Sequence, residues 1–263
     1  MSLRRRAVLA AALLALLLGS AACDRARGIF GKQYEYEEDL YVSLDGTATL
    51  VVNASLPSLV ALRGLDIDPN PSGRVDADKI RAAYQSPVTE VARVSPPWRR
   101  KGRRFIQVRV NVSDIRKLHE APPFSWSRYE LKQEGDKTVF AQHVGASAFK
   151  AGTLQNVGWD GSEVVAFRLH LPSKVRWHNS RSLEKNEPLD VARGNILGWE
   201  QHLTDRLDGA PLDIRVEMES QSILHRTLWL FGGSFLAAVA LLVALIWWTI
   251  RKGRRQHAAS QTS

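Results

Sequence analysis

The chain has 263 residues, a hydrophobic fraction of 44%, a charged fraction of 24% and a formal net charge of +9. This length allows one sizeable domain or two small ones, and the composition is that of an ordinary globular protein. The only cysteine, Cys23, excludes a disulfide within one chain, so the folded part must be held together by its core alone.

Residues 1–23 are predicted to be an export signal. Three arginines at 4–6 precede an apolar stretch at 7–18, and four small residues follow it. This order is typical of a signal peptide, and the apolar stretch is too short to span a bilayer well. Cys23 resembles the lipidated cysteine of a lipoprotein signal, although Ser20 replaces the usual Leu, Val or Ile. The alternative is ordinary cleavage after Ala22, which the small residues permit.

Residues 24–226 are predicted to fold outside the cytoplasm as an α+β domain. Antiparallel β-hairpins dominate it, with two or three short helices, and one domain is favoured over two subdomains split near 145–158. The first hairpin, formed by 34–44 and 47–55, turns at Asp45-Gly46. The next expected elements are helices at 57–63 and 76–85, strands at 88–94 and 105–112, a helix at 114–120 capped by Ser113, and a hairpin of 126–133 with 137–143.

The rest of the predicted domain is all-β. A strand at 165–171 is expected to turn at Pro172-Ser173 and return through 175–177, and a weaker strand is expected at 196–203. The last strand, 212–219, alternates apolar and charged residues strictly, which predicts one buried face and a well-specified register.

Residues 227–250 are predicted to be a single transmembrane helix. The segment contains no charge, and as a helix it rises roughly 36 Å, enough to cross a bilayer. Trp229 and the pair Trp247-Trp248 suit the two membrane interfaces, and four cations begin the short basic tail at 251–263. By the positive-inside rule the tail is cytoplasmic, so we expect a single-pass protein of the bacterial cytoplasmic membrane.

The positive charge belongs mostly to the segments that set this topology. Three cations lie in the export signal and four in the tail, so residues 24–226 keep only +2 of the total +9. A nucleic-acid partner is therefore not expected, because such a partner selects a basic domain.

The sharpest local feature of the domain is a run of cations between two aromatic residues. It consists of Trp98, Arg99, Arg100, Lys101, Arg103, Arg104 and Phe105, at a predicted hairpin tip. Near a membrane each such cation attracts anionic lipid by about 1 kcal/mol, and Trp suits the interface. We expect these residues to contact anionic lipid or an acidic partner. The alternatives are a solvated turn and ion pairing with the acidic residues at 35–39.

No motif for catalysis, a cofactor or a metal stands out. Ser147 lacks the glycine that a nucleophile elbow needs, since Phe149 follows it at that spacing. Oxygen-bearing residues alternate at 66–72 as in a calcium loop, but Pro71 occupies the place of the required glycine. No histidine pair has metal-ligand spacing on one helix face. The sequence predicts neither an enzyme nor a metal or cofactor site.

Cys23, the turn at 44–47, the block at 194–200 and the segment 228–255 resemble the LppM-like bacterial envelope lipoproteins of unknown function. The resemblance implies an α+β exported domain, one C-terminal helix and an envelope role without catalytic residues. We expect a non-enzymatic module that binds lipid or an acidic partner at the membrane surface. An apolar groove could be lined by the tryptophans at 98, 126, 159, 177 and 199, unless most of them belong to the core.

Two alternatives remain for the function. One is an assembly component that binds an envelope protein or pairs with itself through the membrane helix, where Gly233 and Ala237 are small residues four apart. The other is an unrecognised hydrolase, because an acid pair can meet in space without a sequence motif.

Overall fold

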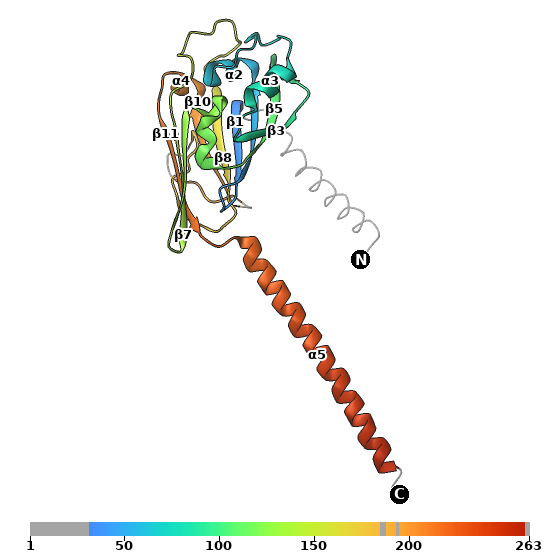
Figure 1. The fold of residues 1–263 in the computed structure, drawn as a ribbon. Coiled ribbons are helices and arrows are strands. Elements are labelled where there is room, and N and C mark those ends of the chain that lie inside the picture. The colour runs from blue at the N-terminus through green and yellow to red at the C-terminus, as the bar shows by residue number, and fades with distance from the viewer. Residues whose placement is uncertain (1–31, 185–187, 193–194, 261–263) are drawn as a thin grey trace, which may run out of the picture.

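The computed structural model describes residues 32–184, 188–192 and 195–260. A folded domain is followed by one long helix, α5 (Ile223–Ser260), which leaves the domain at one end (Figure 1). The predicted export signal and Cys23 lie outside the described residues.

The larger sheet, sheet A, has seven strands in the order β10-β8-β1-β2-β5-β3, with β4 paired to β5. Its strands are β1 (Gln33–Val42), β2 (Ala48–Ser55), β3 (Thr89–Val94), β4 (Trp98–Arg100), β5 (Arg103–Val112), β8 (Glu163–His170) and β10 (Ile196–His202). All neighbouring pairs are antiparallel except β1 and β8, which run in parallel.

The smaller sheet, sheet B, has four antiparallel strands in the order β6-β7-β11-β9. They are β6 (Ser127–Glu134), β7 (Lys137–Val144), β9 (Val175–His178) and β11 (Leu212–Glu219). One hydrophobic core joins the inner faces of the two sheets. Leu40 and Val108 of sheet A are buried in it together with Phe140 and Val216 of sheet B, as strict alternation along the strands predicts.

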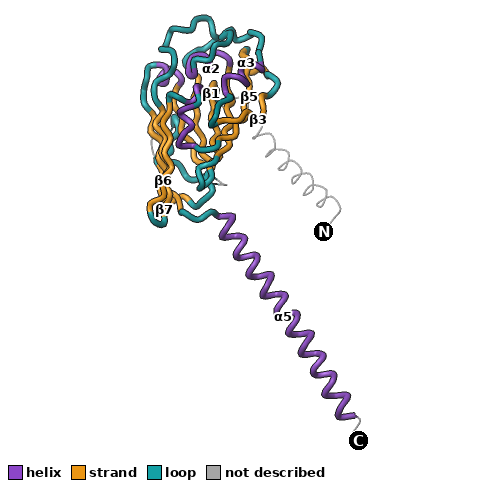
Figure 2. The backbone as a smooth tube through the Cα atoms, in the orientation of Figure 1, coloured by secondary structure: helices purple, strands orange, loops and turns teal. Residues whose placement is uncertain are grey.

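Short helices close the end of the domain opposite to α5, where Figure 2 shows α2 and α3. They are α2 (Leu56–Arg63), α3 (Ala77–Tyr84) and α4 (Leu203–Leu207). Ser55 begins α2 by accepting a hydrogen bond from the Ser58 amide, and Gly64 ends it with a φ of 66°, a left-handed conformation that favours glycine. Asp76 caps α3 in the same way.

The helix predicted at 114–120 is a 3₁₀ helix, η1 (Ile115–Glu120), followed by η2 (Pro122–Phe124). Its cap is Asp114, which accepts a hydrogen bond from the Arg116 amide, and not Ser113 as predicted. Ser113 instead donates from its amide to the Val88 carbonyl and so ties β3 to the end of β5. The prolines at 122 and 123 explain why no longer α-helix forms here.

The strands on either side of Pro172-Ser173 do not pair as predicted. Strand β8 lies in sheet A beside β1, while β9 pairs with β11 in sheet B. The chain therefore passes from one layer to the other at this turn. The apolar residues of β8 and β9 give the same alternation whether the strands share a sheet or face each other, so the pattern could not separate the two cases.

Helix α5 contains one candidate membrane span, Thr227–Trp248, with a mean hydropathy of 2.3. Two backbone hydrogen bonds fix the chain at its start. The Ile223 amide donates to the Pro172 carbonyl at 3.1 Å, and the Ser220 amide donates to the Asp136 carbonyl at 3.0 Å. The span is thus attached to the turn after β8 and to the tip of the β6–β7 hairpin.

Candidate functional site

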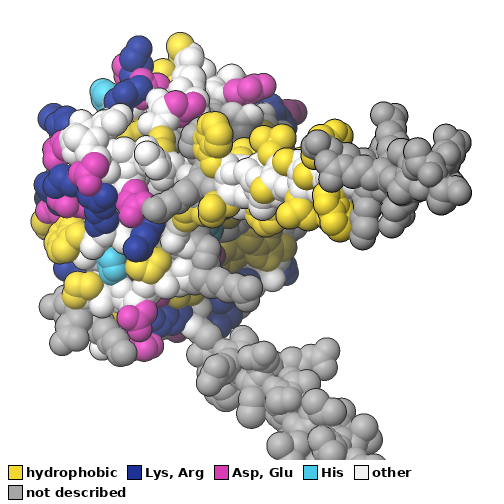
Figure 3. Space-filling model, turned by 90° about the horizontal axis from the view of Figure 1, so that it is seen from below, with side chains coloured by type: hydrophobic (Ala, Val, Ile, Leu, Met, Phe, Trp, Pro, Cys, Tyr) yellow, Lys and Arg dark blue, Asp and Glu magenta, His cyan; other side chains and the backbone are white. Residues whose placement is uncertain are grey.

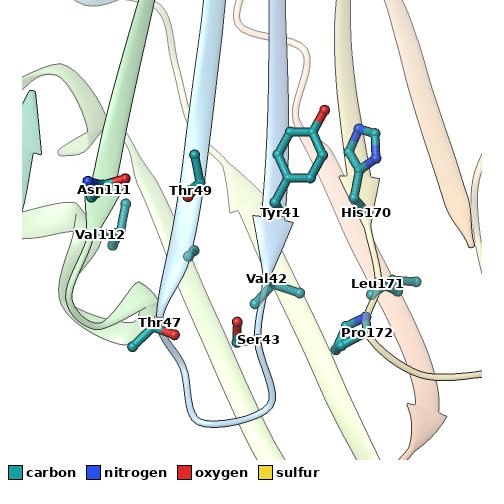
Figure 4. A pocket seen from close by; sticks show the side chains of 11 residues that line it. Tyr41, Val42, Ser43, Thr47, Thr49, Asn111, Val112, His170, Leu171 and Pro172 are labelled. Carbon is teal, nitrogen blue, oxygen red and sulfur yellow. The ribbon is translucent and has the colours of Figure 1, made fainter. Parts of the chain in front are cut away.

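A shallow polar depression lies on the outer face of sheet A, at the end from which α5 leaves. We call it the shelf. Figure 4 shows Asn111, Thr49, Tyr41 and His170 on four neighbouring strands, β5, β2, β1 and β8. The depression has a volume of about 520 Å³, and the lining is completed by Val42, Ser43, Thr47, Ala48, Val112, Leu171 and Pro172.

Strand register explains why these four side chains form one row. Tyr41 pairs with Thr49 across the first hairpin and with His170 across the parallel β1–β8 pair, while Thr49 pairs with Asn111. Paired residues point to the same face of a sheet, so the row crosses four strands at one level. Gly46 makes the hairpin possible, because its φ of 96° suits the tight turn between β1 and β2.

An aromatic stack forms the centre of the shelf. The rings of Tyr41 and His170 lie 3.9 Å apart between centroids and 16° from parallel. Tyr41 is 44% exposed, so its ring presents surface to solvent, and Asp39 lies 3.5 Å from Nε2 of His170. His170 is therefore held between an aromatic ring and a carboxylate.

A chain of ion pairs continues from the shelf along the outer face. Arg168 lies 2.7 Å from the Glu37 carboxylate and 3.7 Å from that of Asp39. Further along, the Tyr34 hydroxyl and Lys32 each donate to Glu200 at 2.6 Å. Burial would raise the pKa of Glu200, but these hydrogen bonds outweigh it and lower that pKa. Charges on this side of the face are therefore paired with one another.

The shelf lies close to the membrane span. Pro172, which lines the shelf, accepts the hydrogen bond from Ile223 at the start of α5. Thr227, where the span begins, follows four residues later, a rise of about 6 Å along a helix. From this end, cationic and anionic side chains lie next to each other, with no large patch of one sign (Figure 3).

A buried polar cluster lies within the hydrophobic core between the two sheets. Arg63 donates to the Glu38 carboxylate at 3.2 Å and to the Tyr36 hydroxyl at 3.0 Å, and its guanidinium lies 3.3 Å from the Trp126 ring centroid. Burial raises the pKa of Tyr36, so its hydroxyl keeps its proton and donates to Glu38. The small void beside Glu38 has a volume of only about 10 Å³, which cannot hold an acyl chain.

The predicted contact residues of the basic run lie far from the shelf. On β5, Phe105 pairs with Ser55, whereas Val112 pairs with Ala48 beside the hairpin turn. Seven residues of extended strand separate the two ends by about 24 Å. The basic hairpin is therefore at the end of sheet A opposite to α5.

Within that run the side chains divide into two groups. Arg103 is buried and lies 2.9 Å from Glu35 and 3.5 Å from Glu163, so for Arg103 ion pairing with the acidic stretch replaces the predicted surface contact. Phe105 is also buried, under the stacked ring of Trp98. Surface contact stays a prediction for Trp98, Arg99, Arg100, Lys101 and Arg104.

The tryptophans proposed for an apolar groove do not meet in one. Trp199 is fully buried, Trp126 and Trp159 pack against the core, and the Trp126 face covers Arg63. Trp98 and Trp177 are 39% and 48% exposed, on different sheets. Their core role is therefore the better interpretation for three of the five.

Within the described residues, no group of three or more His, Cys, Asp or Glu side chains is placed to hold a metal ion. In the loop at 66–72, Asp68 and Asn70 accept hydrogen bonds from the amides of Asn70 and Ser72. Those oxygens stabilise local turns.

Sequence reasoning missed the shelf as a site. The turn at Asp45-Gly46 places Tyr41 opposite Thr49, so the first hairpin alone predicts that these two residues of the row are neighbours. Asn111 and His170 join it only through the order of strands in sheet A, for which the sequence held no signal.

The chain is similar to a solved structure, whereas comparison of its sequence with known families and curated proteins found no match. Among solved structures, the NMR structure of the folded domain of Mycobacterium tuberculosis LppM is similar, with 13% identity and a TM-score of 0.39. The match covers 72% of this chain and 92% of the LppM chain. The weak resemblance to LppM-like lipoproteins that the sequence predicts is thus found in a solved structure as well.

Proposed function

We propose that this protein is a membrane-anchored module of the bacterial envelope that binds the polar head group of a membrane lipid on the shelf. The observation that supports this most is the hydrogen bond from Ile223 to Pro172, which puts the shelf beside the start of α5. With α5 in a bilayer, lipid head groups lie within about two helical turns of Tyr41 and His170.

The chemistry of the shelf suits hydrogen bonding more than charge attraction. Its lining contains hydroxyl, amide and imidazole groups and the exposed ring of Tyr41, but no Asp, Glu, Lys or Arg. Aromatic faces and hydroxyl or amide groups suit a hydroxyl-bearing head group. The void beside Glu38 between the sheets is only about 10 Å³, which supports surface binding of a head group over extraction of a whole lipid.

We propose a non-enzymatic role for the same site. Among the residues that line the shelf, His170 is the one histidine, and no Asp, Glu, Lys or Cys is present to act as a base or nucleophile. Within the described part of the chain, none of the lining hydroxyls of Ser43, Thr47 and Thr49 is hydrogen-bonded to His170. An activated nucleophile requires such a hydrogen bond to a base.

The proposal includes the orientation of the chain in the membrane. The signal-like residues 1–23 and the four cations after the span both support a domain outside the cytoplasm and a tail inside. Lipidation of Cys23 would add a second anchor, on the N-terminal side of the domain in the sequence.

Photo-cross-linking of the full chain in nanodiscs tests this function. The nanodiscs contain phosphatidylglycerol with a photoreactive diazirine on its head group, and labelled peptides are identified by mass spectrometry. We expect the label on peptides that contain Tyr41, Thr49, Asn111 or His170, and a loss of several-fold in Tyr41→Ala. Trp177→Ala is the matched control, because Trp177 is an equally exposed aromatic residue on sheet B.

Three outcomes contradict the proposal. Equal labelling of sheets A and B shows that the shelf has no preference for lipid. Labelling concentrated on 98–104 favours the basic hairpin over the shelf. Cross-links from chain to chain through α5, without lipid labelling, favour self-association of the membrane helix.

A further inference from the structure

Two arginines stand directly opposite each other on the outer face of sheet A. Arg93 of β3 pairs in register with Arg109 of β5, and both are exposed. Paired residues have Cβ atoms about 5 Å apart, so the two guanidinium groups share one patch of surface. We call them the Arg93–Arg109 pair.

Neither arginine has a partner in the part of the chain that the structure describes. Neither guanidinium makes a hydrogen bond, and neither has a carboxylate within 4.0 Å. Like charges directly opposite each other destabilise a sheet. The contrast with Arg168 on the same face is sharp, because Arg168 lies against both Glu37 and Asp39.

A β-bulge keeps this unfavourable pair on the outer face. The register shifts between Val91 and Arg93, so Ala92 is an extra residue opposite no partner. Without the shift, simple alternation would pair Ala92 with Arg109 and turn Arg93 toward the core. The bulge therefore keeps Val94 packed against the core. It also places Arg93 and Arg109 side by side on the outer face.

The surroundings of the pair are polar and accessible. Gln107 and Asn111 flank Arg109 on the same strand and face, and Gln107 donates to the Asn53 side chain at 2.8 Å. Glu90, opposite Asn111, is the acidic residue nearest in register, one row closer to α5. Asn111 also lines the shelf, so the pair lies about 7 Å beyond the shelf along β5.

We propose that the Arg93–Arg109 pair is an anion-binding site for a phosphate group. An unpaired guanidinium presents a planar fork of donors that fits a phosphate with two parallel hydrogen bonds, and a second guanidinium satisfies the remaining oxygens. Bound phosphate also removes the repulsion between the arginines, which explains why such a pair is tolerated. The site stands independently of the proposed lipid binding on the shelf.

Phosphate titration of the full chain in maltoside micelles tests the site, because this detergent contains no phosphate. The side-chain Nε–Hε signals of arginine are followed by NMR as inorganic phosphate is added. We expect saturable shifts at Arg93 and Arg109. Arg93→Gln and Arg109→Gln each should weaken binding about tenfold or more, as expected for losing a hydrogen bond to a charged group. Arg109→Lys should weaken it less, because the charge remains without the fork.

Arg128→Gln is the matched control, since Arg128 is a single exposed arginine of β6 in sheet B. Its binding should equal that of the unchanged chain. Shifts that do not saturate, or that persist in the double Arg93→Gln, Arg109→Gln variant, overturn the site. Tyr41→Ala should leave phosphate binding unchanged while it reduces lipid labelling, so that failure of the shelf and failure of this site are distinguishable.

The source of the phosphate is decided by repeating the titration in nanodiscs. Competition by phosphatidylglycerol nanodiscs, but not by phosphatidylcholine nanodiscs, identifies lipid head groups. Undiminished binding of inorganic phosphate in both identifies a phosphate carried by a soluble or polymeric compound of the envelope.

Discussion

Arginines inside the fold and arginines on the outer face of sheet A have opposite surroundings. Arg63, Arg103 and Arg206 are buried, and each donates to carboxylate, hydroxyl, amide or carbonyl oxygens. Arg93 and Arg109 are exposed and face each other without an acceptor from the described residues. Each interior guanidinium therefore has at least one acceptor beside it, while on the outer face two guanidinium groups lie together.

The buried arginines are required for the fold, whereas the exposed pair is not. Moving a cation out of water is costly, so a buried guanidinium persists only where hydrogen bonds and counter-charges offset that cost. Burial and the neighbouring Arg63 lower the pKa of Arg206 to about 10, because both disfavour its charged form. The outer pair has no such role and can be changed without leaving a buried charge unpaired.

The largest expected effect is at Arg63. Replacing it by Met should destabilise the domain by roughly 3–5 kcal/mol, because the buried Glu38 carboxylate loses the cation paired with it. Urea unfolding of the full chain in maltoside micelles, followed by circular dichroism, measures this.

Arg128→Met is the control for this comparison, since an exposed arginine of β6 should shift stability by no more than about 0.5 kcal/mol. Breaking a buried ion pair costs about 3–5 kcal/mol. If Arg63→Met lowers the free energy of unfolding by less than about 1 kcal/mol, the buried arginine contributes no more to stability than a surface arginine does.

A smaller loss is expected at Arg103. Arg103→Gln should cost about 3 kcal/mol at neutral pH. The effect is moderated because Glu163 still accepts the amides of Asp160 and Gly161, and Glu35 accepts the Trp159 indole. Urea unfolding between pH 4 and pH 8 (about the range over which carboxylates and histidines titrate) measures it.

The pH dependence follows from Glu35. Burial raises the pKa of Glu35, partly opposed by Ser55 and Arg103. The folded state then holds this proton at a higher pH than the unfolded chain does, so its contribution to stability is present at acid pH and is lost as pH rises through the folded pKa. Arg103→Gln should therefore be least destabilising at acid pH. Glu35→Gln should flatten this slope, and an unchanged slope in that variant would show that another group titrates.

Sequence reasoning was most successful where the fold is local. Alternation predicted the first hairpin and its turn at Asp45-Gly46, and the helices at 56–63 and 77–84 follow their capping residues and prolines. In these segments the physical signal lies within a few residues, so no distant partner is needed to read it.

The order of strands and the candidate sites required distant pairing. His170 meets Tyr41 only because β8 lies in parallel beside β1, and alternation tells which face a residue occupies but not which strand is its neighbour. One missed signal was present: Val91 and Val94 both face the core at a spacing of three, which breaks the period of two and indicates the bulge beside Arg93. Glu38, two residues from Leu40, was likewise predictable as an inward acid.

The next effect in size is expected at Tyr41, in the stack with His170 on the outer face of sheet A. Tyr41→Ala should destabilise the domain by about 1 kcal/mol, because the stack with His170 is lost while the half-exposed ring buries little area. Tyr41→Phe keeps the ring and should stay close to the unchanged chain. Equal losses in the two variants, measured by urea unfolding, would mean that the hydroxyl and not the stack matters.

The smallest effect on stability has the opposite sign, and it separates the two groups of arginines most sharply. Arg109→Glu places an acid opposite Arg93, so a repelling pair becomes an attracting one, and the domain should gain about 0.5 kcal/mol. The same change should abolish saturable phosphate binding, because it replaces the second guanidinium by a carboxylate that repels the phosphate. Arg93→Glu should behave in the same way, since the pair is reciprocal. A variant that is more stable but no longer binds phosphate is the result expected of a ligand site held at a cost to the fold. If Arg109→Glu instead destabilises the domain, Arg109 has a structural role, and the distinction between interior and outer arginines fails at this position.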